Sequence, residues 1–243
     1  MNAKEHYDSH LGNFYSWMLG DLPARQEEVY DFFLQHNIVP AATKVAIDLG
    51  AGNGLHTVPL AWLGFHVIAI DFNMQLLTEL SHNAAGFNVD VVSADIRNVS
   101  YYANRHPELI TCMGDTLAHL DSMDDVETLI KDCTGMLAAN GRLVLSFRDY
   151  SIPLEGDARL IHVRSDDNRR LTSFLEYGEQ SVKVTDILYE RNGDTWQQKE
   201  SSYTKVRLSP AMVTDILQQQ GMDIIFRESI AGMHTIITSK KAM

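Results

Sequence analysis

Short apolar runs alternate with amphipathic segments through the first 150 residues of the chain. Residues 44–48 form a β-branched run that stays apolar until its end, which is typical of a strand buried on both faces. Apolar residues recur at helical spacing after Gly54, and Gly64 is a natural C-terminal stop for that helix. Further strands are predicted at 65–71, 88–95, 108–113 and 141–147, and further helices at 74–83 and from 124 onward. This alternation with short connections predicts an α/β fold with a doubly wound, Rossmann-like parallel sheet.

After residue 150 the pattern changes to the alternation of antiparallel strands. Residues 181–190 and 199–208 alternate apolar and polar side chains on either side of an Asn-Gly turn at 192–194. This insert has no helix to pack under it, so we expect it to form a lid. Ser209 and Pro210 are typical of a helix start and Gly221 of its end, and two strands follow. We predict one domain, with a helical cap at 1–40, a ligand-binding core at 41–150, the lid at 151–208, and the last helix and strands at 209–243.

Charge and composition narrow the class of protein. The 20 basic and 32 acidic residues give a net charge of -12, which repels nucleic-acid phosphates and anionic lipid, so we expect neither as a partner. The sequence has no basic leader and no run of about eighteen apolar residues, which predicts a soluble, cytoplasmic protein. Two separate cysteines, Cys112 and Cys133, and ten scattered histidines lack the spacing of a disulfide framework or a metal site. We therefore predict no metal.

A glycine-rich turn follows the first predicted strand, in the segment DLGAGNG at 48–54. Its glycines allow backbone amides to approach a ligand that side chains would exclude. A dinucleotide fingerprint would place the third glycine three positions after the second, whereas Gly54 follows Gly52 by two. The spacing favours a nucleoside ligand without a pyrophosphate, and the alternative is a tight turn that binds nothing.

Two further strand ends carry acidic residues. Asp71 ends the second strand, where a carboxylate can accept hydrogen bonds from both ribose hydroxyls of a nucleoside. Asp95 and Ile96 follow the third strand and could hold an adenine ring, with Phe72 on its other face. The alternatives are a surface aspartate at position 71 and ordinary core packing for the apolar residues.

The residues above and three further segments resemble the class I S-adenosylmethionine-dependent methyltransferases, most closely the glycine N-methyltransferase group. The resemblance covers residues 14–239. The first segment is MLGD at 18–21 followed by Arg25, which looks like that group's Gly-Asp turn and arginine. The second, MGDTLAHL at 113–120, is similar to Gly-Asn-Ser-Phe-Ala-His-Leu, and the third, FRDY at 147–150, to His-Arg-Asn-Tyr. The resemblance implies a seven-stranded sheet with a reversed last strand and an antiparallel lid after the fifth strand.

The resemblance also implies roles for individual residues. S-adenosyl-L-methionine is the implied cofactor, with Asp48 orienting its ammonium end through water or backbone and Arg25 reaching its carboxylate. Arg148 would hold the carboxylate of an amino-acid-like acceptor, and Asp115 would stabilise an ammonium developing on it. The implied cofactor-binding residues are Arg25, Asp48, Gly50, Ala51, Gly52, Asn53, Asp71, Phe72, Asp95, Ile96 and Met113, and the implied catalytic residues are Asp115, His119, Arg148 and Tyr150.

The acceptor side departs from the family pattern. Asp115 replaces the family's asparagine, and Met18 replaces its tyrosine before the Gly-Asp turn. We expect N-methylation of a small amine or amino-acid-like molecule, with Tyr150, Tyr15 or His119 relaying the acceptor proton. O-methylation or another methylation of a small metabolite, and cofactor binding by a non-catalytic regulator, are the alternatives. The family's tetramer-forming N-terminal extension is largely missing, so we expect a monomer or homodimer.

Overall fold

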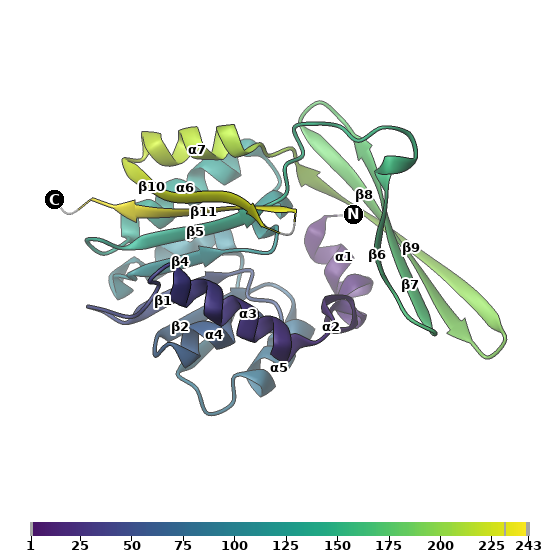
Figure 1. The fold of residues 1–243 in the computed structure, drawn as a ribbon, viewed down its shortest axis with the longest axis horizontal. Helices are drawn as coiled ribbons and strands as arrows, with labels where there is room; N and C mark the ends of the chain where they lie inside the picture. Colours follow the sequence, from purple (N-terminus) through teal and green to yellow (C-terminus); the bar gives the residue numbers. More distant parts are fainter. Residues whose placement is uncertain (1, 231, 242–243) are drawn as a thin grey trace.

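The computed structural model describes residues 2–230 and 232–241, and over these residues the chain forms two β-sheets (Figure 1). The larger sheet has seven strands in the order β10-β11-β5-β4-β1-β2-β3, and the smaller has four in the order β6-β7-β8-β9. The strands of the larger sheet are β1 (Val45–Leu49), β2 (His66–Asp71), β3 (Val89–Ser93), β4 (Leu109–Cys112), β5 (Arg142–Phe147), β10 (Met222–Ile230) and β11 (Met233–Lys240). Those of the smaller sheet are β6 (Leu160–Ser165), β7 (Arg169–Tyr177), β8 (Ser181–Asn192) and β9 (Thr195–Val206).

Helices precede, separate and follow the strands of the larger sheet. The α-helices are α1 (Ala3–Ser9), α2 (Tyr15–Leu19), α3 (Leu22–Gln35), α4 (Thr57–Trp62), α5 (Met74–Asn83), α6 (Met123–Met136) and α7 (Pro210–Gln219). Short 3-10 segments lie at Leu11–Asn13, Ile96–Arg105, Thr116–His119 and Gly156–Arg159. The cap residues act as predicted, since the Ser209 side chain accepts a hydrogen bond from the backbone of Met212 and Pro210 begins α7.

The larger sheet is parallel except at β11, which runs antiparallel to both β5 and β10. Strand β1 lies between β2 and β4 and is parallel to each. The chain therefore proceeds from β1 toward β3 on one side and from β4 toward the reversed strand on the other. Ligands of open α/β sheets bind outside the carboxyl ends of the strands at such a switch point. The predicted α/β fold with a reversed last strand is confirmed.

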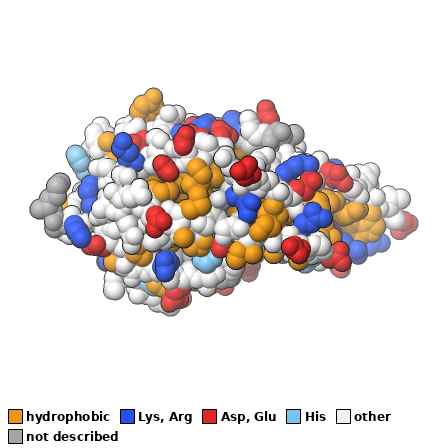
Figure 2. All heavy atoms as spheres, turned by 90° about the horizontal axis from the view of Figure 1, so that it is seen from above, with side chains coloured by type: hydrophobic (Ala, Val, Ile, Leu, Met, Phe, Trp, Pro, Cys, Tyr) orange, Lys and Arg blue, Asp and Glu red, His pale blue; other side chains and the backbone are white. Residues whose placement is uncertain are grey.

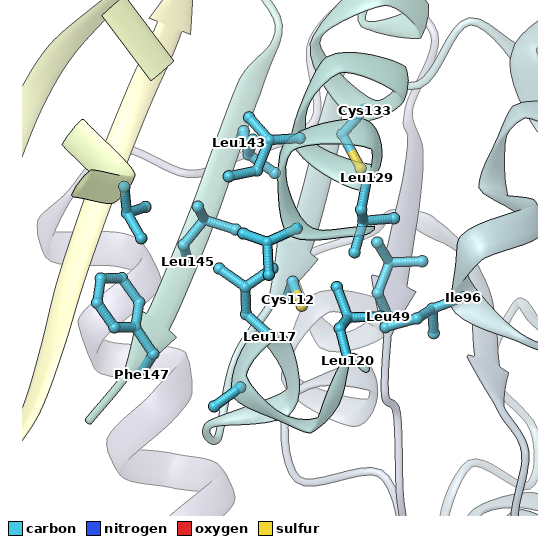
Figure 3. Close-up of a cluster of buried hydrophobic side chains, with 14 of the residues drawn as sticks. Leu49, Ile96, Cys112, Leu117, Leu120, Leu129, Cys133, Leu143, Leu145 and Phe147 are labelled. Carbon is cyan, nitrogen blue, oxygen red and sulfur yellow. The ribbon is translucent and has the colours of Figure 1, made fainter. Parts of the chain in front are cut away.

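Both faces of the central strands are covered, which is why β1, β2, β4 and β5 are buried along nearly their whole length. Every residue of β1 is buried, as the uninterrupted run in the sequence predicted. Figure 3 shows part of the core, in which Leu143 and Leu145 of β5 and Leu129 and Cys133 of α6 belong to one cluster of buried side chains. Cys112 and Cys133 are both free and buried, so they contribute as small apolar side chains.

The smaller sheet is the predicted lid. Strands β8 and β9 pair along their whole length around the Asn-Gly turn, as the alternation indicated, whereas the sequence did not resolve β6 and β7 individually. Helices α1 and α2 lie between the two sheets (Figure 1). One face of the lid therefore looks across the N-terminal segment toward the carboxyl ends of the central strands.

The surface carries both signs of charge. On the face seen in Figure 2, acidic and basic side chains are interspersed without a continuous basic stripe. No helix among the described residues is long and apolar enough to cross a membrane. Within residues 2–230 and 232–241, no three His, Cys, Asp or Glu side chains are grouped so that they could hold a metal ion.

Candidate functional site

A cavity of about 880 Å³ lies between the carboxyl ends of the central strands, the inner face of the lid and the N-terminal helices. All but two of the site residues predicted from the sequence line it. Those that line it are Arg25, Gly50, Ala51, Gly52, Asp71, Phe72, Asp95, Ile96, Met113, Asp115, His119, Arg148 and Tyr150. Its size is within the range of small-molecule sites that enclose most of their ligand.

The other two predicted residues, Asp48 and Asn53, lie behind the cavity wall. Asp48 is fully buried, and its oxygens accept hydrogen bonds from the hydroxyls of Thr57 and Thr111 at 2.6 and 2.7 Å. Asn53 donates to the Ser16 hydroxyl at 2.8 Å, on the side of α2. Neither side chain lines the cavity, so a part for Asp48 in cofactor binding stays a prediction of action through water or backbone, and direct contact of the Asn53 side chain with the ligand has no support from the cavity lining.

The glycine turn has the backbone that its sequence demands. Gly50 and Gly52 have φ angles of +72° and +53°, in the left-handed region that favours glycine. A Cβ on Gly50 would lie 2.4 Å from the side chain of Thr116, so a larger residue at this position would have to displace Thr116. The turn brings the strand end and the Gly52 amide to the cavity wall.

Asp71 closes the same end of the cavity. Its carboxylate accepts the Gly52 amide at 2.9 Å on one oxygen and the Asn73 amide at 2.8 Å on the other. Burial raises the pKa of Asp71, and these backbone donors oppose the rise. Each carboxylate oxygen can accept two hydrogen bonds, so each retains one for a ligand.

The predicted adenine residues lie along the neighbouring wall. Phe72 meets Tyr7 edge-on at a centroid distance of 5.7 Å, and Ile96 is 8% exposed at the cavity. The carboxylate of Asp95 is held by Arg97, with the closest nitrogen at 2.6 Å. Asp95 therefore has a cationic partner already, and both of its oxygens accept hydrogen bonds from Arg97. Its predicted contact with an adenine amine stays a prediction.

Asp115 lies at the opposite end, at the centre of a buried polar cluster. One of its carboxylate oxygens accepts hydrogen bonds from Nζ of Lys205 at 2.5 Å and the Tyr150 hydroxyl at 2.7 Å. The other accepts the backbone amide of Arg148 at 2.9 Å. Burial opposes ionisation of Asp115, but the neighbouring Lys205 ammonium lowers its pKa, while the carboxylate raises the pKa of Lys205 against the effect of burial. Asp115 and Lys205 thus form a buried ion pair that links the core to lid strand β9.

The ion pair with Lys205 affects the role predicted for Asp115, which was to stabilise positive charge on the acceptor. The sequence suggested a carboxylate free to meet a cationic acceptor, yet its charge is compensated by Lys205. Asp115 instead fixes the backbone of Arg148, whose own side chain is exposed at the cavity rim. Tyr150 is also engaged, because its hydroxyl lies between Asp115 and Lys205.

His119 lines the cavity within a stack of rings. Its imidazole lies parallel to Tyr203 at a centroid distance of 5.4 Å and meets Tyr7 edge-on at 5.6 Å. Burial, reinforced by the Lys205 charge, lowers the pKa of His119 to about 3. Its Nδ1 atom is buried and has no hydrogen-bond partner among the described residues. The ring is therefore neutral at pH 7, and its Nδ1 atom is unused.

The lowered pKa predicts how His119 affects stability. Because the unfolded chain binds a proton near pH 6.5 and the folded ring does not, its contribution is complete above pH 6.5 and is lost as pH falls toward 3. We expect the difference in unfolding free energy between wild type and His119→Gln to change by about 1–2 kcal/mol between pH 7 and 5. Urea unfolding at both pH values tests this. A difference that stays constant with pH would contradict a neutral buried ring.

Four residues of this end were not identified from the sequence: Lys205, His6, Asp186 and Tyr203. Asp186 of β8 lines the cavity. Its carboxylate forms hydrogen bonds with Nε2 of His6 at 3.1 Å and with the Ser173 hydroxyl at 2.5 Å. Tyr203 is stacked between the rings of His6 and His119. A signal existed, since Asp186 and Lys205 both occupy inward positions of alternating strands, where an apolar residue is expected.

Comparison with known proteins finds a methyltransferase domain in this chain. A family model described as a methyltransferase domain matches residues 46–141. The glycine/sarcosine N-methyltransferase of Aphanothece halophytica is 25% identical over 134 residues, which are 54% of this chain and 50% of that protein. The glycine/sarcosine/dimethylglycine N-methyltransferase of Actinopolyspora halophila is 28% identical over 138 residues, 56% of this chain and 24% of that protein. The chain thus spans half the length of these relatives or less.

A solved structure shares the fold over nearly the whole chain. The CcbJ methyltransferase from Streptomyces caelestis superposes with a TM-score of 0.79 at 17% identity, covering 97% of this chain and 98% of that one. At that identity the likeness concerns the fold alone. It covers far more of the chain than the segment matched by the family model.

Proposed function

Because the chain carries a class I S-adenosylmethionine-dependent methyltransferase domain and resembles the glycine N-methyltransferase group, we propose that it methylates the nitrogen of a small amine or amino-acid-like acceptor. One observation carries the proposal. A single cavity joins the glycine turn and Asp71 to an end where an unpartnered imidazole nitrogen and an arginine face the same space. The similarity to glycine/sarcosine N-methyltransferases supports nitrogen as the accepting atom.

The residues at the glycine-turn end fit the cofactor. Both oxygens of Asp71 retain capacity for ribose hydroxyls, and the left-handed glycines leave the loop without side chains that would fill the space. Phe72 and Ile96 offer apolar surface to an adenine ring, and Arg25 offers a cation to a carboxylate. When bound, S-adenosylmethionine supplies a methyl group on a cationic sulfur, which is transferred by in-line displacement.

At the other end the chain positions the acceptor and excludes water. Such positioning is the main source of rate enhancement when no covalent intermediate is needed. His119 is a neutral imidazole at pH 7 because its pKa is lowered to about 3, so we assign its Nδ1, with the ring proton on Nε2, the task of accepting a hydrogen bond from a neutral amine. Tyr150 is buried beside Asp115 with its pKa raised by burial and by that carboxylate, which leaves it a hydrogen-bond donor.

A labelled-methyl assay tests the proposal. Purified protein is incubated with methyl-labelled S-adenosylmethionine and a panel containing glycine, sarcosine, 4-aminobutyrate, benzylamine and an amino sugar, with the corresponding alcohols. We expect labelled product with at least one amine and none with its alcohol. Transfer to alcohols alone would establish O-methylation. Cofactor binding, detected by a thermal shift, without transfer to any compound would make the protein a non-catalytic regulator.

Arg148 is expected to bind a carboxylate on the acceptor. Arg148→Ala should raise the KM for a carboxylate-bearing amine roughly 10- to 100-fold, the value of one charge-assisted contact, and leave the Kd of S-adenosylmethionine unchanged. Arg148→Lys retains the charge but lacks the planar guanidinium, so its KM should lie between those of wild type and Arg148→Ala. An unchanged KM in the alanine variant would exclude this contact.

A further inference from the structure

Asp186 is a second buried carboxylate at the acceptor end of the cavity, and the functions described so far leave it unused. It is 4% exposed, projects from the inner face of β8 and lines the cavity. One oxygen accepts a hydrogen bond from the Ser173 hydroxyl at 2.5 Å, and the other contacts Nε2 of His6 at 3.1 Å. Ser173 and Asp186 are register partners on adjacent strands, so this position is fixed by the sheet.

The carboxylates of Asp115 and Asp186 differ in the group that balances their negative charge. Asp115 contacts the Lys205 ammonium directly. The ion-pair partner found for Asp186 within the described residues is the imidazole of His6, whose other nitrogen lies 2.8 Å from the Ser201 hydroxyl. No lysine or arginine of the described chain pairs with Asp186. Asp186 therefore offers a negative charge that a cationic ligand could still meet.

Asp186 also retains the means to bind such a ligand. A carboxylate has about four acceptor sites, and the contacts with His6 and Ser173 occupy two of them. Burial opposes its ionisation, but the hydrogen bonds from His6 and Ser173 lower the pKa of Asp186, so it is charged at pH 7. A buried charge of this kind gains most from a partner that arrives already charged.

The inner face of the lid also carries a positive charge, that of Lys205, at some distance from Asp186. On β9, Lys205 stands opposite Val182, four residues along β8 from Asp186. At about 3.4 Å per residue the two rows are roughly 14 Å apart. The row between them holds Leu175, Val184 and Tyr203, so an apolar strip separates the cation from the anion.

We infer that Asp186, rather than Asp115, receives the amine of the methyl acceptor and selects cationic amines over neutral isosteres. The inference rests on the proposed N-methylation and names the carboxylate that recognises its substrate. As the N–C bond forms and the C–S bond breaks, positive charge passes from sulfur to the acceptor nitrogen. A carboxylate beside that nitrogen stabilises the charge that appears there. A cationic amine first loses one proton to solvent, because only the neutral amine has the lone pair that attacks the methyl group. The positive charge then reappears on the methylated nitrogen as the C–S bond breaks.

The test compares variants of Asp186 in the full chain, using the amine that the wild type methylates fastest in the panel above. Asp186→Asn retains the shape and hydrogen bonding of the side chain but removes its charge. We expect kcat/KM for that amine to fall roughly 10- to 100-fold, with the Kd of S-adenosylmethionine unchanged. Asp186→Glu should recover part of the loss, whereas Asp186→Gln, of the same length but uncharged, should not.

A matched control separates recognition from lid attachment. Ser201→Ala removes a hydrogen bond from His6 while leaving the Asp186 charge in place, so kcat/KM should stay within about threefold of wild type. Equal losses in Ser201→Ala and Asp186→Asn would assign Asp186 to holding His6 and overturn the inference. So would an Asp186→Asn variant within threefold of wild type, or loss of cofactor binding in both uncharged variants. Absence of methyl transfer by the wild type would instead overturn the proposed function.

Discussion

Lys205→Met is expected to lower the free energy of unfolding by about 3 kcal/mol. The substitution leaves the Asp115 carboxylate buried without its cation, and removing one partner of a buried pair costs about 3–5 kcal/mol. We take the lower value because the two side chains retain 9% and 6% exposure at the cavity and because Tyr150 still donates to Asp115. For a chain of 243 residues this corresponds to a fall in Tm of roughly 6–12 °C.

A double-mutant cycle tests this effect. Asp115→Asn alone should also destabilise the protein, since it leaves Lys205 unpaired. The double variant Lys205→Met/Asp115→Asn should be more stable than the sum of the single losses allows, because no buried charge remains. Urea unfolding of the four proteins gives the coupling energy. Additive losses would show that the contact at 2.5 Å contributes nothing to stability.

The larger sheet could be predicted because its information is local. The central strands are short, mostly apolar runs, and glycine or cap residues mark many of the turns between them. The helix predicted at 74–83 is α5 with the same bounds, and the glycine turn after β1 bends as its sequence indicates. Asp71 could be identified because a strand end adjacent to such a turn has one place in a doubly wound sheet.

The acceptor end could not be predicted in the same way, because it is assembled from distant segments. Lys205 and Asp115 are 90 residues apart, and His6 and Asp186 are 180 apart. No spacing rule links such pairs. The sequence did place Asp115, His119, Arg148 and Tyr150 in this region through motif resemblance, but it gave no information on which of them the lid would engage.

The lid strands nevertheless contained a usable signal. Apolar residues mark the inward positions of β8 at Val182, Val184 and Leu188, and Asp186 interrupts that series. On β9, Lys205 follows Tyr203 by two positions and so shares its face. A charged residue at an inward position costs free energy unless it has a partner, so it indicates either an ion pair or a ligand. Lys205 forms an ion pair, and we assign Asp186 to binding a ligand.

Asp71→Ala is expected to raise the Kd of S-adenosylmethionine by at least about 100-fold. The carboxylate can accept two charge-assisted hydrogen bonds from a ribose, each contributing about 1.5–3 kcal/mol. Its removal also frees the amides of Gly52 and Asn73, which it holds at 2.9 and 2.8 Å, so the turn loses part of its order. Both effects act on the cofactor rather than on the acceptor.

Titration calorimetry with S-adenosylmethionine measures this Kd directly. Asp90→Ala is the matched control, because Asp90 lies on the neighbouring strand, is half exposed, and pairs with His66 and Arg105 outside the cavity. It should leave the Kd within about twofold, which separates a local contact from a general change in charge. A folded Asp71→Ala protein that binds the cofactor as tightly as wild type would remove Asp71 from the ribose site. In that case the carboxylate would serve only to tie the glycine turn to the start of α5.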